Sequence, residues 1–351
     1  MKRPLYWDYL KLDTLLSLQG GLEGDAPSPD ELHFIIVHQA YELWFKLILS
    51  QLRLARDHLA EPVLPEEKVP FVVHHLSRVN EILKLCVDQF RVMETLPPQD
   101  FLAFRDKLTP ASGFQSFQMR ELEILLGFQE KDRHTYGGVR ALDHIKQEGG
   151  FAAEKIVDAQ AEVTIRGALL RWLARTPIQG STPSDAGDDA VVTAFISAFL
   201  ANARAHADAS IERLAWALGE SERAGIVTRV EAAHAGSVAF LAEEDPVVRR
   251  ARAGLLFIES YRELPLLAWP RLLLDTVVEM EEQLVLWRHR HARMVERTIG
   301  RRVGTGGSSG VDYLDKTTTY RIFPELWMVR STLLPRERLP PLLHRERYGV
   351  A

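Results

Sequence analysis

Residues 28–46 read SPDELHFIIVHQAYELWFK, and this stretch indicates the fold class more clearly than any other part of the chain. Ser28 suits the N-cap of a helix, Pro29 suits the first helical position, and Glu31 could complete a capping box. From about residue 32 to residue 59, apolar side chains fall on several faces of a helix. A helix that is apolar nearly all round is buried by several neighbours, so the stretch predicts a central helix of a helical core.

The same helical spacing of apolar residues recurs along most of the chain, and strand-like alternation is scarce. Further helices are expected at residues 71–93, 114–128, 149–175, 188–218, 222–242 and 269–299. The sequence therefore predicts an all-α protein. Residues 179–189 are small and polar throughout, which is typical of a linker.

The composition of the 351 residues is that of a globular protein, with 46% apolar and 26% charged residues. A formal net charge of −5 argues against a protein that coats nucleic acid. The single cysteine, Cys86, excludes an internal disulfide or a multi-thiolate metal site and points to a reducing compartment. We find no targeting signal and no stretch that approaches 18 uncharged apolar residues, so a cytoplasmic protein with no membrane span is expected.

His291 is the first candidate for chemistry. It falls inside an apolar stripe formed by residues at alternating spacings of three and four, whereas His289 lies about 200° away around the helix, among charged residues. One interpretation is a core histidine satisfied by a single hydrogen bond. The other is an axial ligand of a metal macrocycle, because proteins hold heme iron with a neutral imidazole in an apolar pocket.

His38 is the second candidate, because Phe34 lies one helical turn before it on the same face. A histidine beside an aromatic ring could line an apolar ligand pocket and offer one hydrogen bond. A structural histidine in a crowded core is the alternative.

Residues 110–121 read PASGFQSFQMRE, and the small residues in this segment allow a tight turn into a helix. Arg120 lies on the second turn of that helix, where its planar guanidinium could bind a substrate carboxylate through two hydrogen bonds. An ion pair of Arg120 with Glu121 or Glu123 is the alternative.

Residues 304–310 read GTGGSSG and follow a helix, so they fit neither the dinucleotide fingerprint nor the phosphate loop. A flexible tether is the default for this composition, but its backbone amides and Thr305 could close over a polar group of a ligand. The chain lacks a His-Glu-x-x-His zinc helix, a Gly-x-Ser-x-Gly elbow and paired cysteines, which argues against those enzyme classes.

Five blocks of the sequence, in this order, closely resemble the tryptophan 2,3-dioxygenase family. They are YWDYLKLD (6–13), FIIVHQAYELWFK (34–46), PASGFQSFQMR (110–120), WRHRH (287–291) and GTGGSSG (304–310). The blocks spread across most of the chain, and together they are far more specific than any one of them. Met119 departs from the pattern, since the family more often has an aromatic residue at that position.

The resemblance implies an all-α helical-bundle protein with one heme b (iron protoporphyrin IX) per subunit. Its reaction would open the indole ring of L-tryptophan with O2 to give N-formyl-L-kynurenine, the first step of tryptophan degradation by the kynurenine pathway. The matched blocks would have to converge on one heme, so residues 1–351 are expected to form a single domain, although the length alone suggests roughly two. Residues from about 140 to 250 carry little resemblance and are expected to be a helical insertion, with the linker near 179–189.

The resemblance also implies a role for individual residues. His291 would be the proximal heme ligand. His38 would be the distal histidine facing the indole N–H, which it would orient without having to abstract the proton. Phe34 would pack against the indole ring. Arg120 would bind the substrate carboxylate, and Thr305 would meet the ammonium or carboxylate end of the substrate.

Tyr6 and Tyr9 match N-terminal tyrosines that, in this family, complete the pocket of a neighbouring subunit, usually in a homotetramer. Two other functions stay open at this point. One is a related heme-dependent oxygenase acting on a substituted tryptophan or another aromatic amino acid. The other is a non-catalytic heme or amino-acid sensor built on the same helical bundle.

Overall fold

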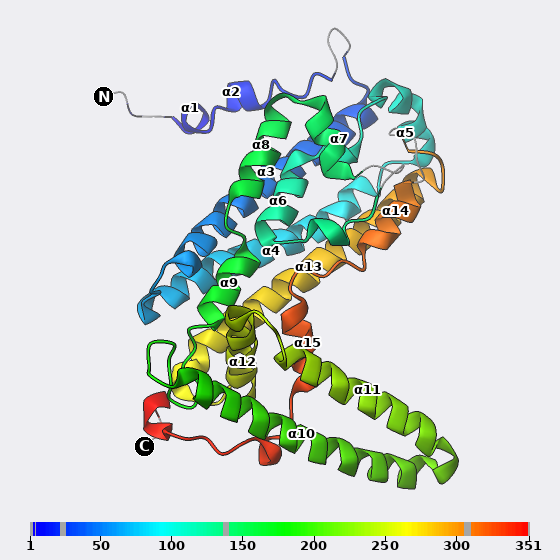
Figure 1. The fold of residues 1–351 in the computed structure, drawn as a ribbon. Coiled ribbons are helices and arrows are strands. Elements are labelled where there is room, and N and C mark those ends of the chain that lie inside the picture. The colour runs from blue at the N-terminus through cyan, green and yellow to red at the C-terminus, as the bar shows by residue number, and fades with distance from the viewer. Residues whose placement is uncertain (1–2, 4, 22–25, 136–139, 305–309, 350–351) are drawn as a thin grey trace. The chain divides into compact units, whose positions relative to one another are not determined.

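The structure is a computed structural model that describes the chain except residues 1–2, 4, 22–25, 136–139, 305–309 and 350–351 (Figure 1). The described residues form helices and no strand, which confirms the predicted all-α class. They divide into two compact units. Unit 1 comprises residues 1–51, 78–162 and 282–320, and unit 2 comprises residues 52–77, 163–281 and 321–351.

The helices of unit 1 are α1 (Tyr6–Leu10), α2 (Leu12–Leu15), α5 (Pro98–Arg105), α6 (Phe117–Leu126), α7 (Ala141–Glu148), α8 (Gly150–Ala161) and α14 (Gly310–Thr317). The helices of unit 2 are α9 (Ile165–Leu173), α10 (Asp188–Leu218), α11 (Arg223–Leu241), α12 (Pro246–Ser260) and α15 (Pro324–Thr332). Three long helices contribute residues to both units: α3 (Pro29–Ala60), α4 (Val69–Met93) and α13 (Ala268–Ile299). Short 3-10 turns join them at 66–68, 106–108, 113–115, 130–132, 220–222, 265–267, 336–338 and 345–348.

Helix α3 begins where the sequence predicts, because the Glu31 backbone N–H donates a hydrogen bond to Ser28 Oγ (3.2 Å). The carboxylate of Glu31 pairs with Lys107 Nζ (3.2 Å). The helix expected at 149–175 is instead two helices, α8 and α9. The Thr164 side chain caps the start of α9 by accepting a hydrogen bond from the Gly167 N–H (3.0 Å), and this cap interrupts the helix that periodicity alone predicts.

An aromatic cluster holds α3, α4 and α13 together in unit 1. The ring centroid of Phe90 lies 5.3 Å from that of Tyr41 and 5.8 Å from that of Trp287. The Tyr41 hydroxyl donates a hydrogen bond to the Cys86 carbonyl oxygen (2.9 Å). This packing brings the second block of the family resemblance against the fourth, although about 240 residues separate them.

Helix α6, which carries Arg120, is held by a second cluster in the same unit. Buried aliphatic side chains of α6, α7 and α8 form it: Ile124, Leu142, Ile145, Ile156 and Ala159. None of these residues was named by the sequence motifs, because ordinary aliphatic side chains carry no signal beyond their periodicity.

Unit 2 is built on a helical hairpin of α10 and α11, with α15 packed on α11 and α12 packed on α9 (Figure 1). Helices α9 and α12 approach closely at Gly254, where a Cβ atom would collide with the Leu173 carbonyl oxygen. The absence of a side chain there is what permits this helix contact.

The polar stretch at 179–189 forms successive turns in unit 2, of which the first is closed by a bridge between Ile178 and Ser181, and its last two residues begin α10. The Gly180 N–H donates to the Tyr348 hydroxyl (2.7 Å), and Gln179 Nε2 donates to the Pro341 carbonyl oxygen (3.0 Å). At its other end, Asp188 pairs with Arg250 (2.8 Å). These bonds hold residues 179–180 against the C-terminal segment. The expected single domain and the expected helical insertion at about 140–250 stay predictions.

Helix α10 is long and apolar enough to cross a membrane by length and composition, and it is the only such helix in the part of the chain that the structure describes. One third of its most apolar window is buried, and its buried side chains pack within unit 2.

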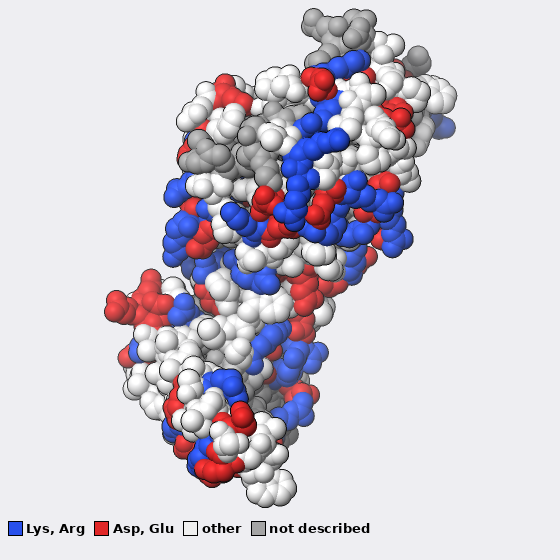
Figure 2. All heavy atoms as spheres, turned by 90° about the vertical axis from the view of Figure 1, so that its right-hand side faces the viewer, with Lys and Arg blue, Asp and Glu red and all other residues white. Residues whose placement is uncertain are grey.

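On the molecular face drawn in Figure 2, positive and negative side chains are mixed.

Candidate active site

A cavity of about 640 Å³ lies within unit 1. Its walls come from α3, the end of α4 at Met93, α5, the 111–116 segment, α6, α13 and α14. The cavity brings together four of the predicted site residues: Phe34, His38, Arg120 and His291. Its volume lies in the range of pockets that enclose small molecules and cofactors.

The other predicted site residues do not line this cavity within the described part of the chain. Tyr6 and Tyr9 are on α1, where their side chains are 71% and 78% exposed. Thr305 lies outside the described residues, but Gly304 and Gly310 on either side of its segment line the cavity.

His291 lies on α13, where its ring stacks on Phe90 with centroids 5.8 Å apart and contacts Trp287 at 5.0 Å. Burial, together with the smaller effects of the nearby His38 and Arg120, lowers the pKa of His291 to about 4. The imidazole is therefore neutral at pH 7. Its ring makes no hydrogen bond to the described residues. The choice between a core histidine and a ligand of a bound metal group stays a prediction.

His38 faces the cavity from α3 with a defined tautomer. Its Nδ1–H donates to the Phe34 carbonyl oxygen (2.7 Å), which leaves Nε2 as a hydrogen-bond acceptor. His38 is exposed toward the cavity, but protein atoms surround its ring, and the loss of hydration that they cause lowers its pKa although the bond to the Phe34 carbonyl opposes the shift. A neutral imidazole with a free acceptor suits binding of a ligand N–H.

Phe34 packs against His38 with ring centroids 3.9 Å apart. It also belongs to an aromatic cluster with Phe101 and Phe104 of α5, each with its centroid 5.7 Å from that of Phe34, and of these two only Phe101 lines the cavity. The sequence motifs missed these two residues of α5, because a Phe-x-x-Phe spacing is common in ordinary core helices.

Arg120 makes an ion pair with Glu123, which is one of the two partners that the sequence offered as alternatives. Its Nη1 lies 3.1 Å from Glu123 Oε2, and its side chain is 11% exposed. Its Nε is buried without a hydrogen-bond partner in the described part of the structure. Arg120 is therefore both an ion-pair partner and a donor with unused capacity at the cavity.

Glu123 lies at the centre of a buried group of three arginines. Arg133 Nη1 lies 2.5 Å from Oε2, and Arg288 Nη2 lies 3.1 Å from Oε1. Burial alone would raise the pKa of Glu123, but Arg120, Arg133 and Arg288 outweigh it and hold that pKa at about 2. The sequence shows that Glu123 is three residues from Arg120, but it carries no signal for the other two partners.

Glu42 of α3 anchors the loop that leads into α6. Its carboxylate accepts hydrogen bonds from Ser116 Oγ (2.7 Å) and from Gln118 Nε2 (2.7 Å). Ser116 in turn caps α6 by accepting from the Met119 N–H (3.4 Å). Because of this cap, α6 begins at Phe117 and follows a 3-10 turn at 113–115. The residue that departs from the family pattern, Met119, is buried and lines the cavity.

The described residues offer few side chains that could bind a metal ion together. Among the described residues, no group of three or more His, Cys, Asp or Glu side chains could hold a metal ion. A metal bound by His291 would need most of its ligands from a non-protein group, as the four nitrogens of a porphyrin supply.

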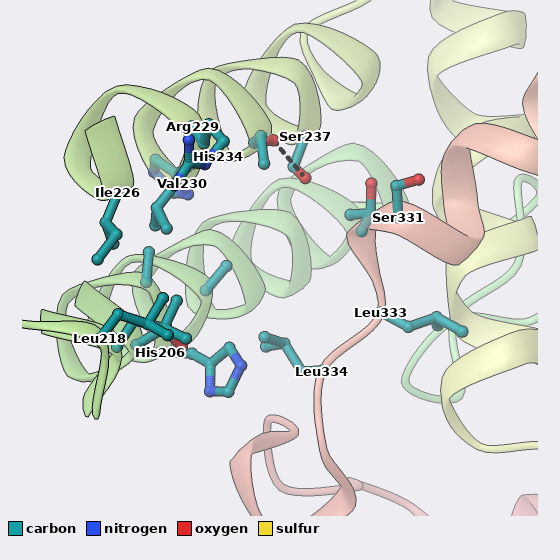
Figure 3. A pocket seen from close by; sticks show the side chains of 16 residues that line it. His206, Leu218, Ile226, Arg229, Val230, His234, Ser237, Ser331, Leu333 and Leu334 are labelled. Carbon is teal, nitrogen blue, oxygen red and sulfur yellow. Dashed lines mark hydrogen bonds between the residues drawn. The ribbon is translucent and has the colours of Figure 1, made fainter. Parts of the chain in front are cut away.

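A second cavity, of about 470 Å³, lies in unit 2 between α10, α11 and residues 331–334 (Figure 3). His206 comes from α10, whereas Arg229 and His234 come from α11. The hydrogen bond drawn there runs within α11, from Ser237 Oγ to the Ala233 carbonyl oxygen. None of the blocks that carry the family resemblance contributes to this cavity, so the unit 1 cavity is the stronger candidate.

Comparison with known proteins identifies the family to which the chain is similar. Residues 2–333 match the family model described as tryptophan 2,3-dioxygenase. The chain is 44% identical to "Tryptophan 2,3-dioxygenase 2" of Ralstonia nicotianae, over 100% of this chain and 99% of the relative. It is 43% identical to the tryptophan 2,3-dioxygenase of Sorangium cellulosum, over 98% and 87% of the two chains. A "Tryptophan 2,3-dioxygenase-like protein" of Xanthomonas campestris is 47% identical over 72% of this chain and 96% of its own.

Proposed function

The chain belongs to the tryptophan 2,3-dioxygenase family, and from that membership we propose which of its residues carry out the reaction. The reaction is heme-dependent: both atoms of O2 are added at the indole C2–C3 bond of L-tryptophan, which gives N-formyl-L-kynurenine and begins the kynurenine pathway. The observation that carries the proposal is that Phe34, His38, Arg120 and His291, from three separate blocks, line one cavity.

We propose that His291 holds one heme b per subunit through its neutral imidazole. Three observations support the fit: the lowered pKa, the lack of a hydrogen bond to the described residues, and the aromatic surroundings of the ring. The indole Nε1 of Trp287, one turn earlier, is buried without a partner in the part of the chain described, and such a donor needs an acceptor from a bound group. When bound, the heme supplies the iron that activates O2, which no side chain can do.

His38 and Phe34 orient the indole ring. Nε2 of His38 accepts the indole N–H, because its Nδ1 is already occupied by the Phe34 carbonyl. The lowered pKa makes His38 a weak base, which favours a positioning hydrogen bond over obligatory proton abstraction. The Phe34 ring packs on the indole face and keeps water from the reacting carbons.

Arg120 binds the substrate carboxylate. Its guanidinium lines the cavity, its Nε lacks a partner, and it is mostly shielded from solvent. Two parallel hydrogen bonds to a carboxylate are strong and directional under these conditions. We assign Thr305 to the ammonium or carboxylate end, and the support is that Gly304 and Gly310, the described residues on either side of its segment, line the cavity.

The N-terminal arm is proposed to complete the site of a neighbouring subunit in a homotetramer. Helices α1 and α2 have no buried residue, and Tyr6 and Tyr9 are exposed. Aromatic side chains that are left exposed on an arm favour docking on another subunit. We also propose a cytoplasmic location, since the lone Cys86 is buried and free.

The test is to mix the reduced, heme-loaded protein with L-tryptophan and air and to follow the near-ultraviolet absorption of N-formylkynurenine. Substituted tryptophans and tyrosine run in parallel. Faster turnover of L-tryptophan supports the proposal. Faster turnover of a substituted tryptophan would reassign the substrate, and heme binding with no turnover would indicate a sensor.

A further inference from the structure

Glu123 is buried in the wall of the cavity, and it joins three arginines that come from three parts of the chain. Its side chain is 2% exposed, and both of its oxygens are engaged. Arg120 lies three residues before it on α6, Arg133 lies beyond the end of that helix, and Arg288 lies on α13. A buried carboxylate with this many partners is either a purely structural centre or a device that positions one of the arginines.

Two of the arginines, Arg133 and Arg288, are held by further contacts besides their pairs with Glu123. The Arg133 guanidinium lies over the Phe128 ring at 5.1 Å, and its Nε also bonds to Glu130 (2.9 Å). Arg288 lies over the Tyr320 ring at 5.1 Å. Glu123 is thus anchored from one side by groups that cannot easily move, because each is packed as well as paired.

Arg120 is attached to this anchor through one nitrogen only. Its Nη1 pairs with Glu123 Oε2, while its buried Nε has no partner in the described structure. In a planar guanidinium, Nε and Nη2 form the edge that can grip a carboxylate with two parallel hydrogen bonds. Holding Nη1 in place leaves that edge available.

The charges in this group favour the same interpretation. The three guanidinium groups share the single buried carboxylate of Glu123, whereas Glu130, which pairs with Arg133, is 37% exposed and also lies 3.9 Å from Arg140 Nη1. Positive charge therefore exceeds negative charge in this buried group, and a substrate carboxylate would offset part of the excess.

We propose that Glu123 is a positioning residue that fixes Arg120 so that its Nε/Nη2 edge meets the carboxylate of the substrate. This inference rests on the proposed role of Arg120. Loss of the anchor lets the Arg120 side chain move away from the position that the substrate needs, and small misplacements of a binding group are costly.

The test compares heme-loaded wild-type protein with Glu123→Gln, Glu123→Asp and Glu130→Gln. Calorimetry measures the dissociation constants of L-tryptophan and of tryptamine, which has the same indole and amine but no carboxylate. Steady-state turnover of L-tryptophan gives KM and kcat. Glu130→Gln is the matched control, since it removes a carboxylate from Arg133 without touching Arg120.

Glu123→Gln is expected to raise the Kd and KM of L-tryptophan by about ten- to a hundredfold, with a smaller change in kcat. The Kd of tryptamine for Glu123→Gln should stay within about twofold of the wild-type value. For Glu130→Gln, the Kd values of both L-tryptophan and tryptamine should stay within the same range. Glu123→Asp, which keeps the charge, should restore part of the loss. Unchanged or tighter binding of L-tryptophan by Glu123→Gln, or an equal loss for both ligands, would overturn the proposal.

Arg120→Ala separates the two levels of the inference. If it fails to weaken L-tryptophan relative to tryptamine, the proposed role of Arg120 is wrong. If Arg120→Ala weakens L-tryptophan relative to tryptamine and Glu123→Gln does not, only the proposed positioning role of Glu123 is wrong. Should Glu123→Gln not fold, as judged by circular dichroism, the ratio of the two dissociation constants in Glu123→Asp decides, and a wild-type ratio would overturn the proposal.

Discussion

Replacing Arg120 by alanine removes the group that we propose for the substrate carboxylate, and the loss can be estimated from its surroundings. A hydrogen bond to a charged group contributes about 1.5–3 kcal/mol, so two parallel bonds contribute about 3–6 kcal/mol before solvent screening. The Arg120 side chain is 11% exposed, so screening is partial, and its pair with Glu123 already uses one nitrogen. We therefore take about half of the 6 kcal/mol upper limit, or about 3 kcal/mol, as the binding free energy lost in Arg120→Ala. This loss corresponds to a Kd for L-tryptophan that is roughly a hundredfold higher.

The assay is the Kd and KM of L-tryptophan for the heme-loaded Arg120→Ala protein, with its Soret band as the control. The Soret band should be intact, because Arg120 is not expected to hold the heme. Arg120→Lys keeps the charge but cannot form two parallel bonds, so its loss should be intermediate, at about tenfold. A normal KM for L-tryptophan in Arg120→Ala would refute the assignment of the carboxylate site.

The remaining predictions concern two histidines and the buried carboxylate. His291→Ala should lose heme, measured as heme content per subunit, and full occupancy with an unchanged Soret band would contradict its role as the ligand. His38→Ala should weaken L-tryptophan binding and lower kcat/KM by up to about tenfold, since one neutral hydrogen bond is lost. An inactive His38→Ala protein that binds L-tryptophan normally would argue for proton abstraction instead. Glu123, with a pKa of about 2 against an ordinary value of 4.5, should stabilise the fold fully above about pH 4.5 and lose that contribution as the pH falls toward 2. The contribution is on the order of 3 kcal/mol, so urea unfolding at pH 7 and pH 3 should show a larger acid loss for wild type than for Glu123→Gln. Equal acid losses would show that Glu123 keeps an ordinary pKa.

Much of the helical architecture could be read from local pattern. The bounds of α10 agree with the expected 188–218, and α3 starts at the predicted Pro29, because caps and apolar periodicity act over one or two turns. The prediction of a single helix at 149–175 was wrong, because the Thr164 cap starts a new helix, α9, within a stretch whose apolar periodicity is continuous. Helices such as α12 and α15, which lie outside the named motifs, needed the structure.

For the site, the sequence by itself determined which residue types are present: a histidine in an apolar stripe, a histidine one turn after a phenylalanine, and an arginine on an aromatic helix. Together with the family blocks, these were enough to indicate heme chemistry on tryptophan. Only the tertiary structure decided that Phe34, His38, Arg120 and His291 share one cavity.

The buried group around Glu123 was decided entirely by tertiary structure. Arg288 is 165 residues away from Glu123 in the chain, and nothing in the local pattern of either residue signals their contact. The physical reason is that helix formation depends on neighbours three or four residues apart, whereas a buried charge is tolerated only where distant parts of the chain bring it partners.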